Sequence, residues 1–167
     1  MATKRQGIKN WLLLNSSFAE ALLKKAVFKK DLDALEQRME ESARVPHDEE
    51  PVDDYLALLG NYREKESELL EISLRILATN NSAIFCEGET ISQAIIRRDS
   101  LKRVVSMYNK LLSAATGSGR GMFHSRDIKY KRVVNMDKVR SDMDNAAMQY
   151  RDIDVKLQQL NWNTELL

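Results

Sequence analysis

The stretch from Val139 to Leu160 places an apolar or small side chain at alternating steps of four and three residues. The positions are Val139, Met143, Ala146, Tyr150, Ile153, Leu157 and Leu160. These steps keep one stripe on a single side of an α-helix, and such a helix must bury the stripe against other helices. The pattern therefore predicts a helix-packing protein, and a coiled coil with another chain is one way to satisfy it.

Three earlier segments carry stripes of the same kind. A capping box from Ser17 to Glu20 opens the first segment, because the serine oxygen can accept a backbone N–H while the glutamate reaches back. A second box, Thr90 to Gln93, opens the third. The predicted helices cover residues 17–44, 52–79, 91–115 and 136–160. We expect an all-α, mainly helical fold, an antiparallel bundle of about four long helices.

Two segments between the helices favour extended structure. Residues 82–86 are short, apolar and β-prone, and Glu87-Gly88-Glu89 follows as a turn. Ile128, Tyr130 and Val134, spaced by two and four, predict a strand over about 127–134. We expect these segments to add a short β arm or hairpin to the bundle, and pairing between them is one possible arrangement.

Composition limits the number of domains and the class of partner. The chain has 167 residues, with 26 Lys and Arg against 25 Asp and Glu, a net charge of +1. This length suits a single domain, placed at residues 17–167 after an N-terminal extension over residues 1–16. A near-neutral balance gives no global argument for nucleic acid. Apolar runs fall short of the roughly 18 residues that span a bilayer, so no membrane partner is expected.

Cysteine and histidine are too scarce for common catalytic or metal chemistry. Cys86 is the only cysteine, which excludes an intramolecular disulfide and fits a reducing compartment such as the cytoplasm. His47 and His124 share no ligand spacing with it, and a structural zinc ion needs four ligands. We therefore expect no catalytic residues, no cofactor and no metal, and interpret the chain as non-enzymatic.

The segment from Arg120 to Arg132 is the candidate contact for an anionic partner. Its cations are Arg120, Arg126, Lys129, Lys131 and Arg132, against one acid. Interleaved aromatic side chains could stack on the bases of a nucleic acid. The alternative, which we favour because the whole chain lacks a basic excess, is an edge strand that charge protects from unwanted pairing. The glycine-rich linker before it lacks the strand–loop–helix order of a phosphate loop.

Arg98 is the single charge on the stripe of the third predicted helix. Its guanidinium must reach solvent or meet a carboxylate. Asp142, Asp144 and Asp154 on the last predicted helix are possible partners. We predict an interhelical ion pair in preference to a ligand-binding arginine, and the next residue, Asp99, belongs to the same candidate site.

Several short motifs occur in order along the chain. They are Gly88-Glu89-Thr90-Ile91, Arg97-Arg98-Asp99 and the tail Asn161-Trp162-Asn163-Thr164. With these motifs, residues 17–167 resemble the septicolysin-like family of small bacterial proteins, essentially a domain of unknown function. The resemblance implies a mainly helical fold and no defined activity. Asn161 and Trp162 complete the set of candidate binding or interface residues.

Two functions stay open. The first is a self-associating helical protein, a homo-oligomer with a scaffold or interaction role, for which the seam from Val139 to Leu160 offers a surface and Trp162 an anchor. The second is a binding module whose basic arm, residues 120–132, holds an anionic partner such as nucleic acid. We favour the first, and an enzyme that uses carboxylates comes third.

Overall fold

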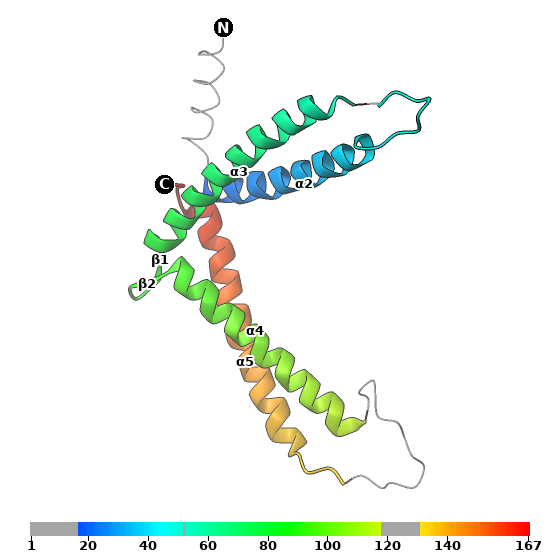
Figure 1. The fold of residues 1–167 in the computed structure, drawn as a ribbon. Coiled ribbons are helices and arrows are strands. Elements are labelled where there is room, and N and C mark those ends of the chain that lie inside the picture. The colour runs from blue at the N-terminus through cyan, green and yellow to red at the C-terminus, as the bar shows by residue number, and fades with distance from the viewer. Residues whose placement is uncertain (1–16, 52, 118–130) are drawn as a thin grey trace, which may run out of the picture. The chain divides into compact units, whose positions relative to one another are not determined.

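The structure is a computed structural model that describes residues 17–51, 53–117 and 131–167. Its elements are α2 (Phe18–Ser42), α3 (Tyr55–Ser82), β1 (Ile84–Cys86), β2 (Glu89–Thr90), α4 (Ile91–Thr116) and α5 (Met136–Asn163) (Figure 1). The helices contain 25, 28, 26 and 28 residues, more than half of the chain. The predicted mainly helical fold with a short hairpin is confirmed.

Contacts along the chain group it into two compact units, which are described separately. The described part of unit 1 lies within residues 17–83 and 160–167, and unit 2 spans residues 84–159. Within the described residues, no helix combines the length and the hydropathy needed to cross a membrane. A single domain over residues 17–167 stays a prediction.

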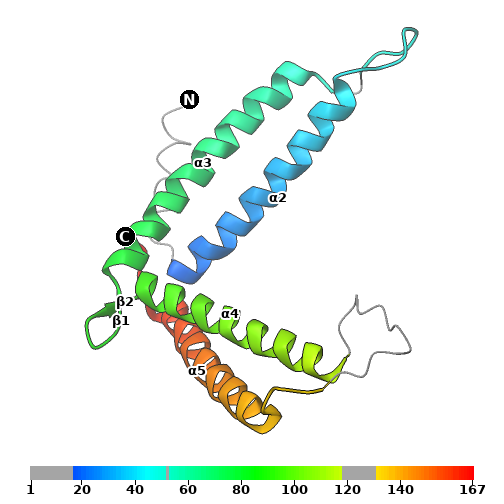
Figure 2. The ribbon, with the colours of Figure 1, turned by 60° about the horizontal axis from the view of Figure 1, so that its bottom comes forward.

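In unit 1, α2 and α3 lie side by side as an antiparallel pair (Figure 2). The predicted capping box opens α2, since the Glu20 amide donates to Ser17 Oγ at 3.3 Å and the Ser17 amide donates to Glu20 Oε2 at 3.1 Å. Helix α3 begins three residues later than predicted. Asp54 explains this start, because its Oδ1 accepts the Leu56 amide at 3.0 Å and so caps the helix.

The core of unit 1 joins the helix pair to the C-terminal tail. Its buried cluster is Phe18, Ala21, Ile72, Ile76 and Leu166. The Phe18 amide donates to the Thr164 carbonyl oxygen at 3.2 Å, which holds the tail beside the start of α2. Most positions of the predicted apolar stripes are buried or half-buried. The stripe positions are Phe18, Leu22, Phe28, Leu32, Leu35 and Met39 on α2, and Tyr55, Leu59, Tyr62, Leu69, Ile72 and Ile76 on α3. Tyr55 is the exception at 59% exposed, because it begins α3 at the end of the pair.

Unit 2 begins with the hairpin. Strands β1 and β2 are antiparallel, with Ile84 opposite Thr90 and Cys86 opposite Glu89. The turn passes through Glu87 (φ 46°) and Gly88 (φ 80°), and the left-handed conformation of Gly88 has little cost because glycine has no Cβ.

The strand predicted over 127–134 is not supported where the structure describes it. Residues 131–134 form no strand, and residues 127–130 lie outside the described ranges. Pairing of residues 84–86 with that segment would close a loop of about 40 residues, whereas β2 follows β1 directly. Loop-closure entropy favours the local partner, because each doubling of a loop's length costs about 0.6 kcal/mol.

Helices α4 and α5 lie side by side in both ribbon views (Figures 1 and 2). The second predicted capping box opens α4, where the Gln93 amide donates to Thr90 Oγ1 at 3.3 Å. The seam from Val139 to Leu157 is buried or half-buried at each of its six positions in unit 2. This seam is therefore used for packing within the chain and is not the free surface that the sequence suggested.

Candidate functional site

The motif residues around the hairpin come together in unit 2. Glu89 on β2 accepts a hydrogen bond from Arg97 Nη2 at 2.7 Å, and Arg97 lies about two turns into α4. The Cys86 thiol donates a hydrogen bond to Oε2 of the same carboxylate, with a distance of 3.6 Å between sulfur and oxygen. The hairpin is thereby tied to the first turns of α4 through one carboxylate.

Phe85 lies at the centre of this arrangement. Its ring is 6% exposed, and Lys156 Nζ on α5 lies 4.7 Å from the ring centroid. Arg97 Cζ on α4 lies 5.9 Å from the same centroid. Both cations are within the roughly 6 Å over which a ring face attracts positive charge. We call Phe85, Glu89, Arg97 and Lys156 the hairpin clasp, because they link the hairpin to both helices.

Arg98 forms the predicted link between the helices of unit 2. Its Nη1 lies 3.4 Å from Asp154 Oδ1 on α5, while Nε and Nη2 donate to Asp99 Oδ1 at 3.0 and 2.9 Å. Burial lowers the pKa of Arg98, but the hydrogen bond to Asp99 and the charges of Asp99 and Asp154 outweigh burial and raise the pKa above its ordinary value. The predicted ion pair with the last helix is confirmed.

The charged side chains of this region form ion pairs with one another. Arg97 faces Glu89, and Arg98 faces Asp99 and Asp154, so their charges are directed at one another. Within the described ranges, no group of three or more His, Cys, Asp and Glu side chains is placed to hold a metal ion. The clasp and the Arg98 pair can hold the hairpin and helices of unit 2 together.

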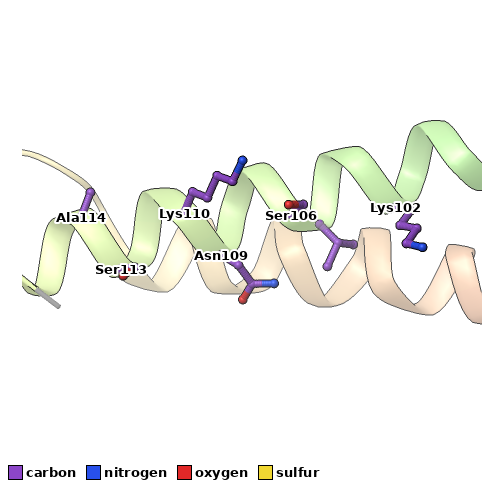
Figure 3. Close-up of a pocket in the computed structure, with 7 residues that line it drawn as sticks. Lys102, Ser106, Asn109, Lys110, Ser113 and Ala114 are labelled. Carbon is purple, nitrogen blue, oxygen red and sulfur yellow. The ribbon is translucent and has the colours of Figure 1, made fainter. Parts of the chain in front are cut away.

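A groove of about 600 Å³ runs along one side of α4 (Figure 3). Its lining residues are Lys102, Val105, Ser106, Asn109, Lys110, Ser113 and Ala114. They follow one another at steps of mostly three and four residues, so they share one face of the helix. Two lysines and three neutral polar residues line the groove beside Val105 and Ala114, while most of its lining surface is made of carbon atoms.

Unit 1 presents a different surface, on the outer side of α3. Leu70, Leu74 and Leu77 are each more than half exposed and are spaced by four and three residues. The opposite side of the same turns carries the buried Ile72, Ile76 and Thr79. The C-terminal half of α3 is therefore apolar on two sides, and only one side is covered. We call Leu70, Leu74 and Leu77 the leucine stripe.

The residues that the sequence selected belong to different units or lie outside the described residues. Arg98 and Asp99 lie together in unit 2, whereas Asn161 and Trp162 belong to unit 1. Trp162 is 68% exposed, so its ring does not cap a core. Arg120, Arg126 and Lys129 lie outside the described residues. Lys131 and Arg132 are exposed, and Arg132 Nε donates to the Ala115 carbonyl oxygen at 3.2 Å.

Sequence reasoning did not select Phe85, Lys156, the α4 groove or the leucine stripe as sites. A signal for the groove was present, because residues 102–150 contain ten Lys and Arg against four Asp and Glu. The basic segment selected from the sequence, residues 120–132, covers only part of this basic region. The leucine stripe also had a signal, a second run of four-and-three steps on α3.

Comparison with known proteins places the chain without assigning an activity. A model described as a family of unknown function (DUF6847) matches residues 25–166. No curated protein matches the chain. The chain is similar to a crystal structure of a functionally unknown conserved protein from Corynebacterium diphtheriae, with 29% identity and a TM-score of 0.85. That match covers 92% of this chain and 99% of the other. Because the family match extends over most of its length, the chain belongs to DUF6847, a family of unknown function.

Proposed function

We propose that this protein is a non-enzymatic helical interaction protein that self-associates through the leucine stripe of α3. The observation that carries the proposal is the exposure of Leu70, Leu74 and Leu77 opposite a face that is already buried. A helix that is apolar on two sides normally has neighbours on both. The proposal places this function in a reducing compartment such as the cytoplasm, and the septicolysin-like resemblance stays a prediction.

A second copy of the chain is a suitable occupant for the stripe. Steps of four and three match the seam of a helix pair, and a two-fold axis would place the stripe of one copy against the same stripe of the other. Trp162 is not required for this contact, although it stays a predicted anchor because of its exposure.

The small apolar area of the leucine stripe limits the expected strength of self-association. Complete burial of a leucine contributes about 1.5–3 kcal/mol, and the six leucines of two copies are already nearly half covered. The remaining gain, on the order of 1 kcal/mol for each leucine, is comparable with the low end of the roughly 4–15 kcal/mol cost of association. We therefore expect a weak dimer that forms only at high protein concentration.

Light scattering after size exclusion tests the proposal. The mass should rise above 19.2 kDa as the protein concentration increases, and Leu74→Glu should hold it at the monomer value. Leu23→Glu is the matched control, because Leu23 is equally exposed but lies on α2 and not on the stripe. A mass of 19.2 kDa at several hundred micromolar would exclude self-association. An equal loss of association in both variants would show that the stripe is the wrong surface.

A further inference from the structure

The net charge of +1 for the whole chain is the sum of a negative charge on unit 1 and a positive charge on unit 2. Residues 1–83 and 160–167, which make up unit 1, contain 12 Lys and Arg against 16 Asp and Glu, a net charge of −4. Unit 2 contains 14 against 9, a net charge of +5. The absence of a global basic excess is therefore no argument against an anionic partner for unit 2, because a binding face responds to local charge.

The excess in unit 2 is concentrated at one end of its helix pair. The described residues of this end, 102–117 and 131–150, contain seven Lys and Arg against three Asp and Glu, a net charge of +4, whereas residues 84–101 and 151–159 have a net charge of −1. The described part of this region contains the second half of α4 and the first half of α5, which lie side by side (Figure 1). At the hairpin end, by contrast, Arg97 and Arg98 are paired with Glu89, Asp99 and Asp154.

The α4 groove lies in this basic region, and its lining contains no acid among the described residues. Lys102 and Lys110 are exposed, and neither has a described carboxylate within ion-pair distance. Between and beside them, Ser106, Asn109 and Ser113 supply hydroxyl and amide donors (Figure 3). Lysine, serine and asparagine side chains are the usual donors to phosphate oxygens of nucleic acids.

Arg132 extends the cationic strip beyond the groove. Its Nε donates to the carbonyl oxygen of Ala115, the residue after the groove's Ala114. From Lys102 to Ala115 the helix rises about 20 Å at 1.5 Å per residue. That length exceeds a single phosphate ion and corresponds to about six nucleotides at the 3.4 Å spacing of one strand in a double helix, and to fewer nucleotides of an extended single strand.

We propose that the α4 groove, together with Arg132, binds the phosphodiester backbone of a nucleic acid without reading its sequence. The cations and neutral donors along the groove contact successive phosphates, and the contact releases condensed counterions. An anionic membrane fits less well, because a membrane-binding helix also inserts large apolar side chains, and the groove lining offers only Val105 and Ala114.

Fluorescence anisotropy with a labelled 20-nucleotide oligo-dT and the full chain, over a salt series from about 50 to 200 mM, tests the proposal. We expect binding in the micromolar range at low salt, with a slope of log K against log [salt] of about −2 for three phosphate contacts on a single strand. The variant Lys102→Gln/Lys110→Gln/Arg132→Gln should weaken binding at least tenfold and bring the slope close to zero. All three residues are exposed, so circular dichroism should show an unchanged helix content.

The matched control removes the same charges from another part of the chain. Lys29→Gln/Lys30→Gln/Arg44→Gln also replaces two lysines and one arginine, all exposed residues of unit 1. This control should bind as the unaltered protein does. An equal loss of affinity in both triple variants would overturn the proposal, since it would indicate a response to net charge alone.

Two further probes distinguish the kind of partner. Oligonucleotides of other base compositions should bind within about threefold of oligo-dT, because phosphate contacts do not depend on sequence. Vesicles that contain phosphatidylserine should not pellet the protein under the same conditions. Absence of binding to any oligonucleotide at 50 mM salt, or binding to vesicles alone, would overturn the proposal.

Discussion

Arg98 Nη1 on α4 lies 3.4 Å from Asp154 Oδ1 on α5, and the same guanidinium is held by Asp99. The side chains of Arg98 and Asp154 are 29% and 27% exposed, so both charges are partly removed from water. A half-buried ion pair of this kind contributes little by itself, but the removal of only one sign of charge leaves the other unpaired. This asymmetry gives the first prediction.

Arg98→Met should lower the free energy of unfolding by less than about 1 kcal/mol, because the methionine keeps the packing of the arginine stem. Asp99→Ala/Asp154→Ala should lower it by more, about 2 kcal/mol, because the half-buried guanidinium loses both carboxylates. Urea unfolding followed by circular dichroism measures both values. Equal and negligible effects would show that Arg98 is simply solvated.

The hairpin clasp predicts an energetic coupling between Phe85 and Lys156. A double-mutant cycle with Phe85→Leu and Lys156→Met should give a coupling energy of about 0.5–1 kcal/mol, as a cation near a ring face implies. Phe85→Leu with Lys138→Met is the control, since Lys138 is exposed and pairs with Asp142. A coupling no larger than that of the control would mean that Lys156 only lies near the ring.

Thr79 holds the C-terminal tail in unit 1 through its hydroxyl group, so removal of this group should lower the free energy of unfolding. Its buried hydroxyl donates to the Arg75 carbonyl oxygen at 3.0 Å and accepts the Leu167 amide at 3.0 Å. Thr79→Val keeps the shape but leaves that amide without its acceptor, so unfolding should become easier by about 1–2 kcal/mol. Thr116→Val, at the exposed end of α4, should cost clearly less. Chemical denaturation of both variants decides, and similar costs would contradict the role of Thr79.

The ion pair between Arg38 and Asp53 should make the stability of the fold depend on pH in the acidic range. Arg38 Nε and Nη2 donate to the Asp53 carboxylate at 3.0 and 2.6 Å, and this hydrogen bonding lowers the pKa of Asp53 below its ordinary value. Because the pKa of Asp53 is lower in the folded state, the pair stabilises the fold at pH values above the ordinary aspartate pKa of about 4. This stabilisation is lost as the pH falls through the lowered pKa. Carboxyl NMR titration should show the pKa of Asp53 rising toward its ordinary value in Arg38→Gln. Lys29→Gln is the control and should leave it unchanged.

Local sequence patterns were enough to locate the four helices that the structure describes. Capping boxes at Ser17 and Thr90, and stripes spaced by three and four residues, act within one or two turns of a helix, so they can be recognised from neighbouring residues alone. The same periodicity placed Arg98 on the stripe of its helix, with Asp142, Asp144 and Asp154 as possible partners. The structure pairs it with Asp154 and also with the neighbouring Asp99.

Only the tertiary structure decided which of these elements meet. The grouping of Leu166 with Phe18 and the approach of Lys156 to Phe85 join residues that are far apart in the chain, and no local pattern encodes such contacts. The partner of β1, the exposure of Trp162 and the concentration of basic charge in unit 2 were settled in the same way. The physical reason is that caps and periodicity depend on short-range geometry, whereas burial and local charge depend on which surfaces the folded chain brings together.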